Sequence, residues 1–176
     1  MPLFFITGVA GSGKSTVLQE LISRGYEAYG IDEDGFAHWH NNKTGYIHPK
    51  SSVKTSDRTP DFLNNHTWKI DRNMVEDLAS KAKTRPVFVC GVARNENELL
   101  DLFTGKFALI VDANTLKHRI ATRENNDYGK TAHELEQILK DQASNEERYS
   151  KARYILIDAT QPKDRVVDDI ISASDV

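Results

Sequence analysis

Eight consecutive residues near the start of the chain have the types and spacing needed to hold phosphate groups: Gly8-Val9-Ala10-Gly11-Ser12-Gly13-Lys14-Ser15. Their glycines permit backbone conformations and close approaches that a Cβ would block, so successive N–H groups can point inward at phosphate oxygens. The Lys14 side chain can reach the β- and γ-phosphates, and the Ser15 hydroxyl can bind Mg²⁺. The stretch therefore predicts a site for a nucleoside triphosphate and its magnesium ion.

The segments on either side of this loop support the prediction. Residues 3–7 are a short run of bulky, mostly apolar side chains, which predicts a buried strand. In residues 16–22 apolar side chains recur at helical spacing, and a helix that begins here directs the positive end of its dipole at a bound phosphate. The expected nucleotide contacts in this region are Gly8, Ala10, Gly11, Ser12, Gly13, Lys14, Ser15 and Thr16.

Strand and helix patterns alternate along the rest of the chain. Apolar or alternating runs predict further strands at residues 26–31, 86–90, 107–111 and 154–158. Periodic apolar positions and start signals predict helices at residues 60–83, 95–103, 112–123, 131–149 and 162–172. This alternation predicts an α/β fold in which five parallel strands are covered by helices on both faces.

Two polar segments interrupt the alternation. Residues 33–60 are rich in His, Asn, Ser and Lys, and we interpret them as an insertion with little regular structure beyond a short helix at 36–40. Residues 124–130 form a second, shorter polar break between two helices. A length of 176 residues fits a single domain that spans residues 1–176.

The amino-acid composition argues against binding to duplex nucleic acid or membranes and against cysteine-based sites. A formal net charge of −3 and a pI near 6.1 provide no electrostatic footprint for duplex nucleic acid or an anionic membrane. Cys90 is the only cysteine, so the chain can form neither an internal disulfide nor a cysteine zinc cluster. No apolar run is long enough to cross a membrane, and no leader pattern precedes the first strand. We expect a cytoplasmic protein.

A cluster of three acidic residues, Asp32-Glu33-Asp34, follows the second predicted strand. With the glycine-rich loop, it resembles the pattern of small P-loop kinases in the nucleoside monophosphate kinase-like group, such as adenylate, shikimate and gluconate kinases. The resemblance extends over residues 3–171. It implies a three-layer P-loop NTPase fold with the strand order 2-3-1-4-5, in which residues 33–60 lie on the acceptor side and residues 124–130 form a short lid.

In those families one acid of this pair holds the acceptor hydroxyl or acts as a base, and the other lies near the metal. The residues do not decide which of Asp32 and Asp34 has which role. The third strand ends in Cys90 where many P-loop proteins have an acid, so we expect Asp32 and Ser15 to lie nearest the magnesium ion. A carboxylate beside the acceptor hydroxyl can orient it and take its proton.

Three arginines match positions of the same group. Arg94 lies in Cys90-Gly91-Val92-Ala93-Arg94, which is similar to the adenylate kinase motif whose arginine grips the acceptor phosphate. Arg119 and Arg123 resemble the arginine pair that stands at the start of the lid segment in this group. In those kinases the pair contacts ATP and the transferred phosphoryl group. The i, i+4 spacing of Arg119 and Arg123 places them on one helix face. With Lys14, these cations are expected to stabilise the transition state.

The loop after the fifth strand, residues 158–162, resembles the one that packs against adenine in this group. The resemblance implies adenine contacts from Ala159, Gln161 and Pro162, beside nucleotide contacts from Arg119 and Arg123. Pro162 also suits the start of a helix.

The predicted function is transfer of the γ-phosphoryl group of ATP, with Mg²⁺, to a small-molecule acceptor. The acceptor can be a nucleoside, a nucleotide, a sugar acid or another polyol, and the protein a monomer or homodimer. A polynucleotide 5′-hydroxyl kinase and an ATP-binding module without transferase activity are the alternatives.

Aromatic and histidine residues in or near the longer polar segment have a second possible interpretation. Trp39 and Trp68 fit packing, with stacking on an acceptor ring as the alternative. His38, His40 and His48 lack the spacing of a typical metal site, so we interpret them as solvent or substrate contacts.

Overall fold

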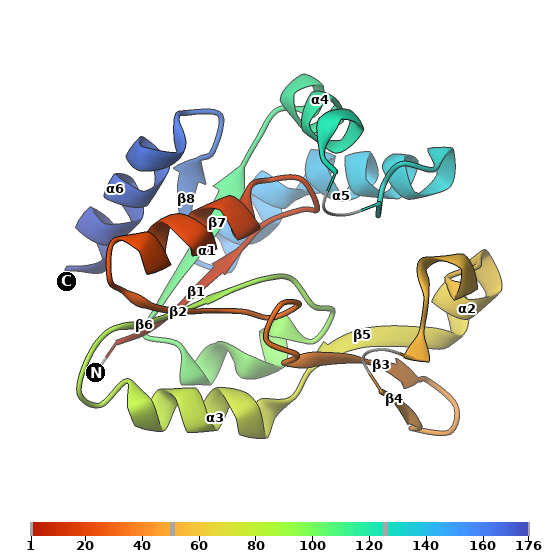
Figure 1. Ribbon diagram of the computed structural model, residues 1–176, viewed down its shortest axis with the longest axis horizontal. Helices are drawn as coiled ribbons and strands as arrows, with labels where there is room; N and C mark the ends of the chain where they lie inside the picture. Colours follow the sequence, from red (N-terminus) through yellow and green to blue (C-terminus); the bar gives the residue numbers. More distant parts are fainter. Residues whose placement is uncertain (1, 50–51, 125–126, 176) are drawn as a thin grey trace.

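The computed structural model describes residues 2–49, 52–124 and 127–175, and they contain two β-sheets (Figure 1). Five strands form the main sheet: β1 (Leu3–Thr7), β2 (Glu27–Gly30), β6 (Val87–Cys90), β7 (Gly105–Ile110) and β8 (Ile155–Asp158). All four neighbouring pairs are parallel, in the order β2-β6-β1-β7-β8. Numbered within this sheet alone, the order is 2-3-1-4-5, which confirms the predicted fold class.

The main sheet separates two apolar layers because its side chains alternate between faces. Phe4 and Ile6 of β1 pack with α1 (Lys14–Ser23), α4 (Ala113–Thr122) and α6 (Lys163–Ser174). Leu3 and Phe5 point to the opposite face and pack with α3 (Arg72–Lys81), the 3₁₀ helix η3 (Glu96–Leu102) and α5 (Ala132–Lys151). Figure 1 shows α1 and α6 on one side of the sheet and α3 on the other. Both faces are therefore covered, as predicted.

The polar segment holds more regular structure than predicted. Residues 37–41 form the strand β3 (Ala37–Asn41) rather than a helix, and β3 pairs with β4 (Ile47–His48) and β5 (His66–Ile70) in an antiparallel sheet. The turn after β3 favours this pairing, because the Asn41 side chain accepts hydrogen bonds from two backbone N–H groups in it. Gly45 completes the turn with a φ of 72°.

The single helix predicted for residues 60–83 is also wrong. The chain forms α2 (Pro60–Asn65), then β5, then α3. Residues 66–70 have β-branched and aromatic side chains that favour pairing with β3, and Asp71 begins a new helix by accepting a hydrogen bond from the Asn73 N–H. The predicted start of the first of these helices is confirmed, because Thr59 caps it and Pro60 is its first residue.

The other predicted elements differ mainly at their ends. The helix expected at 95–103 is the 3₁₀ helix η3, and the helix expected at 131–149 is α5. Thr131 caps α5 by accepting a hydrogen bond from the Glu134 N–H. A further 3₁₀ turn, η2 (Thr55–Asp57), precedes α2. Residues 50–51 of the predicted insertion and 125–126 of the predicted lid lie outside the described residues.

A buried amide fixes the small sheet against the main one. The Asn95 side chain accepts a hydrogen bond from the Ile70 N–H at 2.9 Å and donates one to the Ile70 carbonyl at 3.0 Å. Both residues are buried, at 7% and 3% exposure. The amide thus acts as a short strand partner for the end of β5, and it links β5 to the loop that follows β6.

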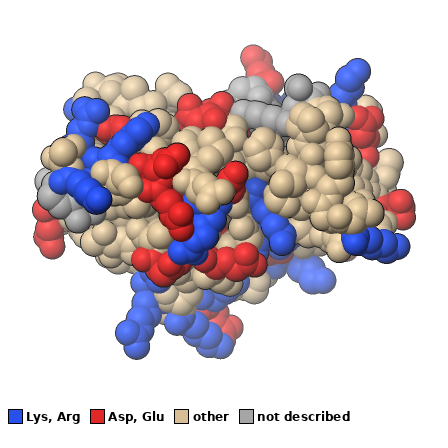
Figure 2. Space-filling model, turned by 90° about the horizontal axis from the view of Figure 1, so that it is seen from below, with Lys and Arg blue, Asp and Glu red and all other residues tan. Residues whose placement is uncertain are grey.

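The surface seen in Figure 2 has interleaved basic and acidic side chains, and neither sign forms a continuous stripe on that face. Its right-hand part, where the small sheet lies in Figure 1, is largely uncharged. Among the helices in the described part of the chain, none is both long and apolar enough to cross a membrane.

We expect Asn95→Ala to lower the free energy of unfolding by about 2 kcal/mol, because it leaves the buried Ile70 N–H and carbonyl without partners. Urea unfolding followed by circular dichroism measures the loss. Asn73→Ala, at an exposed position, is the control and should change the stability by less than about 0.5 kcal/mol. Equal stability of the two variants would contradict the anchoring role of Asn95.

Candidate functional site

A cleft of about 1240 Å³ opens at the carboxyl end of the main sheet. Residues from the loop after β1 form one part of its lining, and residues from β3, α2 and β5 form another. Helices α4 and α5 and the loops after β6 and β8 complete it. This edge of an open parallel sheet is where α/β proteins bind their ligands.

The glycine-rich loop joins β1 to α1, as the sequence predicted. Gly13 precedes the helix with a φ of 105°, and Gly11 has a φ of 87°, so both occupy backbone conformations that side chains disfavour. A Cβ on Gly11 would also lie 2.9 Å from a methyl group of Leu116 in α4. The loop is therefore held in a tight curve against α4. All residues from Val9 to Val17 line the cleft, which includes every predicted contact of this loop except Gly8.

Lys14 is the central cation of the loop. Its Nζ donates hydrogen bonds to the carbonyls of Gly8 at 2.7 Å and Val9 at 2.8 Å. Desolvation of the ammonium group lowers the pKa of Lys14 to about 8, and the nearby charges of Asp32 and Glu96 oppose that decrease. The cation is thus enclosed by loop carbonyls, with two carboxylates close enough to influence it.

The Ser15 hydroxyl binds an acid of the cluster that follows β2. Ser15 Oγ donates a hydrogen bond of 2.8 Å to Glu33 Oε1. A hydroxyl and a carboxylate are hard oxygen ligands of the kind that Mg²⁺ prefers. The start of α1 therefore fits a magnesium ion, with Ser15 and Asp32 lining the cleft. Glu33, which sequence reasoning missed, binds Ser15 but is absent from the lining.

The two aspartates of the acidic cluster have separate positions. Asp32 lines the cleft and is close enough to Lys14 to raise the pKa of that amine. Asp34 is absent from the cleft lining, and its Oδ2 accepts a hydrogen bond of 2.7 Å from the Gly30 N–H. Asp34 therefore stabilises the turn after β2, and the structure does not bring it to the site together with Asp32.

The end of β6 carries no charge. Cys90 is buried, and this burial, together with the charge of Glu33, raises the pKa of its thiol far above the usual range. The thiol stays protonated at neutral pH. It cannot supply the carboxylate that many P-loop proteins have at this strand end.

A buried carboxylate enters the cleft from a different element. Glu96, the first residue of η3, is 6% exposed and lines the cleft. Its Oε2 accepts a hydrogen bond of 3.1 Å from Thr7 Oγ1, at the end of β1. Burial raises the pKa of Glu96, and the charges of Arg148 and Lys14 oppose the increase. No motif marks this residue, because only the fold brings η3 beneath the glycine-rich loop.

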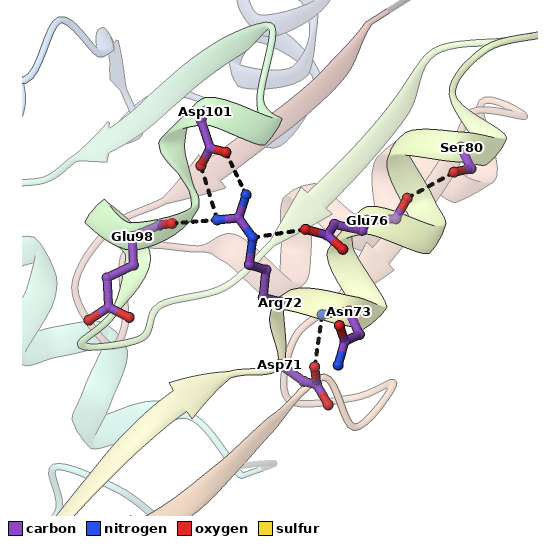
Figure 3. Close-up of polar contacts among 7 residues, drawn as sticks. All are labelled: Asp71, Arg72, Asn73, Glu76, Ser80, Glu98 and Asp101. Carbon is purple, nitrogen blue, oxygen red and sulfur yellow. Dashed lines mark hydrogen bonds and ion pairs between the residues drawn. The ribbon is translucent and has the colours of Figure 1, made fainter.

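An ion-pair network fixes the helix that carries Glu96 (Figure 3). Arg72, at the start of α3, contacts Asp101 through two hydrogen bonds and donates a third to the Glu98 carbonyl at 2.8 Å. Its Nε binds Glu76 on its own helix at 2.8 Å. These contacts join α3 to η3, the element that begins with Glu96.

The predicted arginines all line the cleft. Arg94 is exposed and lies 3.6 Å from Asp141 of α5. Arg119 donates hydrogen bonds to the carbonyls of Ser12 at 3.2 Å and Ala159 at 2.8 Å. It therefore bridges the glycine-rich loop and the loop after β8.

Arg123 lies at the end of α4 and donates a hydrogen bond to the Tyr128 carbonyl in the predicted lid. Its Nε is buried and has no hydrogen-bond partner among the described residues. Of the predicted adenine contacts, Ala159 and Gln161 line the cleft, whereas Pro162 caps α6 and is absent from the lining. The next residue, Lys163, lines it instead.

No group of three or more metal-binding side chains occurs within residues 2–49, 52–124 and 127–175. Two histidines of the small sheet contact an aromatic ring: the ring centroids of His48 and Phe62 are 5.8 Å apart, and His66 stacks on Phe62 with centroids 3.9 Å apart.

The loop geometry and the strand order 2-3-1-4-5 define a P-loop fold of the kind found in small kinases. The model of an AAA domain family, AAA_18, matches residues 5–148. The chain belongs to this family. No curated protein matches the sequence significantly.

Solved structures of small kinases share this fold. The shikimate kinase of Bacteroides thetaiotaomicron is 17% identical, with a TM-score of 0.63 and 99% coverage of both chains. A gluconokinase of Sinorhizobium meliloti is 19% identical, with a TM-score of 0.57 and coverage of 99% of this chain and 91% of its own. The deoxyadenosine kinase of M. mycoides is 14% identical, with a TM-score of 0.58 and full coverage of both chains.

The pKa of Lys14 predicts a pH-dependent affinity for nucleoside triphosphates. Phosphate oxygens favour the charged amine, so a protein whose Lys14 has a pKa of about 8 must take up a proton when it binds ATP above that pH. We expect the affinity to fall by about tenfold between pH 7 and pH 9. Calorimetric titration with Mg-ATP in buffers of different ionisation enthalpy measures both the affinity and the proton uptake.

Three variants test the origin of this dependence. Lys14→Arg keeps a cation that does not titrate in this range, so its affinity should not change with pH. Glu96→Gln removes a charge that raises the pKa of Lys14, and should move the decline to lower pH. Glu98→Gln removes an exposed acid of η3 and should leave the pH of the decline in affinity unchanged. A decline that is identical in the wild type and Lys14→Arg would exclude Lys14 as its source.

Proposed function

We propose that this protein is an ATP- and Mg²⁺-dependent phosphotransferase that moves the γ-phosphoryl group to a small-molecule acceptor. One observation carries the proposal: a single cleft contains the glycine-rich loop and Lys14 together with Asp32 and Arg94. Donor and acceptor groups therefore face the same enclosed space. The kinase fold and the AAA_18 match support this assignment.

On the donor side, the backbone N–H groups of residues 10–16 hold the phosphates, and Lys14 exchanges its two loop carbonyls for phosphate oxygens. Arg119 lies between this loop and Ala159, so it is placed to contact both the phosphates and the base. Ser15 would hold the magnesium ion, with Asp32 and Glu33 as the acidic groups beside it. When bound, the ion neutralises charge on the β- and γ-phosphates.

On the acceptor side, Asp32 orients the acceptor hydroxyl and accepts its proton. The hydroxyl oxygen forms a bond to the γ-phosphorus while the bond to the β,γ-bridging oxygen breaks, so that ADP leaves with that electron pair. Lys14, Arg119 and Arg123 stabilise the charge on the transferred group. Arg94 pairs with Asp141 in the free protein and binds an anionic group when the acceptor has one.

Two further parts of the cleft have proposed roles. The segment 33–60, extended by α2 and β5, forms the acceptor side. Residues 124–130 form a short lid, of which Tyr128 lines the cleft. The Arg58 guanidinium lies 5.9 Å from the Tyr128 ring, so the two parts meet across the opening.

We expect Lys14→Ala to abolish phosphoryl transfer, with a loss of at least about 100-fold in kcat, while the protein remains folded. Asp32→Asn should lower kcat by about 100-fold with little effect on the KM for ATP. Asp34→Asn should retain kcat within about threefold, because the side chain only holds the turn after β2. A panel of nucleosides, nucleotides, sugar acids and polyols with labelled ATP measures turnover.

Thermal unfolding of each variant controls for loss of structure. A loss of kcat in Asp34→Asn, with none in Asp32→Asn, would reverse the assignment of the acids. ATP binding without turnover on any acceptor would favour a nucleotide-binding module, and salt-dependent phosphorylation of oligonucleotide 5′-ends would favour a polynucleotide kinase.

A further inference from the structure

The acceptor side of the cleft contains a pair of tryptophans. Trp39 of β3 lies directly opposite Trp68 of β5, and their ring centroids are 5.2 Å apart. Both side chains are half-buried, and both line the cleft. The two indoles therefore form a continuous aromatic surface on one wall of the site.

Packing behind this surface holds the rings in place. Phe62 of α2 contacts Trp39 edge-on, with centroids 5.4 Å apart and an interplanar angle of 77°. His66 also stacks on Phe62, nearly parallel, with ring centroids 3.9 Å apart. The pair is thus supported by α2, so a ligand that contacts it meets a preformed surface.

Backbone contacts fix the distance between this surface and the reacting groups. The Arg94 N–H donates a hydrogen bond of 3.0 Å to the Trp68 carbonyl. Asn95 clamps Ile70, two residues further along β5. The aromatic surface therefore lies beside Arg94 on the same cleft that contains Lys14 and Asp32.

The buried core of the small sheet is formed by other residues. Ala37 and Ile70 are 0% and 3% exposed, and they belong to the core cluster that also contains Phe5 of the main sheet. Trp39 lies outside that buried cluster, and Trp68 packs only against its edge. Two large rings that remain accessible from the cleft are poorly explained by packing alone.

We propose that Trp39 and Trp68 bind a planar heteroaromatic ring of the acceptor, so that the substrate is a nucleoside or a nucleoside monophosphate rather than a sugar acid or another polyol. This inference rests on the proposed phosphotransferase function and names its acceptor class. The flat faces of nucleobases stack on aromatic side chains irrespective of base identity. A linear sugar acid has no face of that shape, and would leave much of this apolar surface exposed.

Nucleosides and nucleoside monophosphates both carry a base, but only the monophosphate carries a phosphate group that Arg94 can bind. A monophosphate would gain a charged contact from Arg94 that a nucleoside lacks. Arg94→Gln should therefore weaken the binding of monophosphates at least about tenfold and that of nucleosides much less.

Trp39 and Trp68 are the only tryptophans in the sequence, so intrinsic tryptophan fluorescence reports on this surface directly. With saturating Mg-ADP in the donor site, we expect cytidine, adenosine or their monophosphates to quench the emission in a saturable manner. Gluconate and shikimate should not. Excitation beyond the nucleoside absorption band, and correction for residual absorption, remove the optical artefact.

Substitutions separate stacking from structural support. Trp68→Leu should raise the KM for the nucleoside acceptor by about tenfold or more, whereas Trp68→Phe retains a ring and should stay within about threefold. Tyr46→Leu is the matched control, because this exposed ring beside β4 is absent from the cleft lining and should leave KM unchanged. Trp39→Phe and Trp39→Leu provide a second pair if Trp68→Leu does not fold.

The outcomes distinguish this inference from the function on which it rests. Efficient phosphorylation of a polyol or sugar acid, with a KM that does not change in Trp68→Leu, would overturn the inference and support the kinase. Saturable quenching by nucleosides without turnover would support the aromatic site and overturn the phosphotransferase. A lack of quenching by every nucleoside and monophosphate would overturn the inference whatever the turnover.

Discussion

The site depends on how one cation is held at the end of one strand. The Lys14 side chain folds back toward the glycine-rich loop, where its ammonium group donates hydrogen bonds to the carbonyls of Gly8 and Val9. These bonds replace the water that burial removes from the ammonium group. That arrangement needs the positive φ angles of Gly11 and Gly13, because only then does the chain curl around the amine. Asp32 and Glu96 moderate the cost of burying the charge. The curl of the loop thus turns on Lys14 and the two glycines.

The rest of the fold brings groups from distant parts of the chain to this cation. The parallel sheet places the ends of β1, β2, β6 and β8 at one edge, so the loops that follow them meet around Lys14. The small sheet adds a second wall, and Asn95 fixes it to the loop after β6. Because the main sheet and the small sheet line different parts of the cleft, the junction at Ile70 sets the spacing between the two parts.

Local patterns predicted most of the main sheet and the loop that joins β1 to α1. The glycine-rich loop and the pair Arg119 and Arg123 are local motifs. The strand order follows from the family that these motifs resemble. The errors fall where long-range pairing decides the structure: residues 66–70 pair with β3, which overrides a helical pattern. Glu96 was missed because η3 reaches Thr7 only after folding. Asp34 matched the motif, but its carboxylate accepts a hydrogen bond from the Gly30 N–H and does not line the cleft.

We propose that the loop from Gly8 to Ser15 binds the phosphates of a nucleoside triphosphate. Backbone amide NMR signals during a titration with Mg-ATP test this directly, since they report on each N–H group separately. We expect the amide signals of Gly11, Gly13 and Lys14 to shift most and to saturate together, and those of exposed α3 residues such as Asn73 to stay unchanged. Unperturbed loop amides at saturating nucleotide, or shifts confined to another part of the molecule, would contradict it.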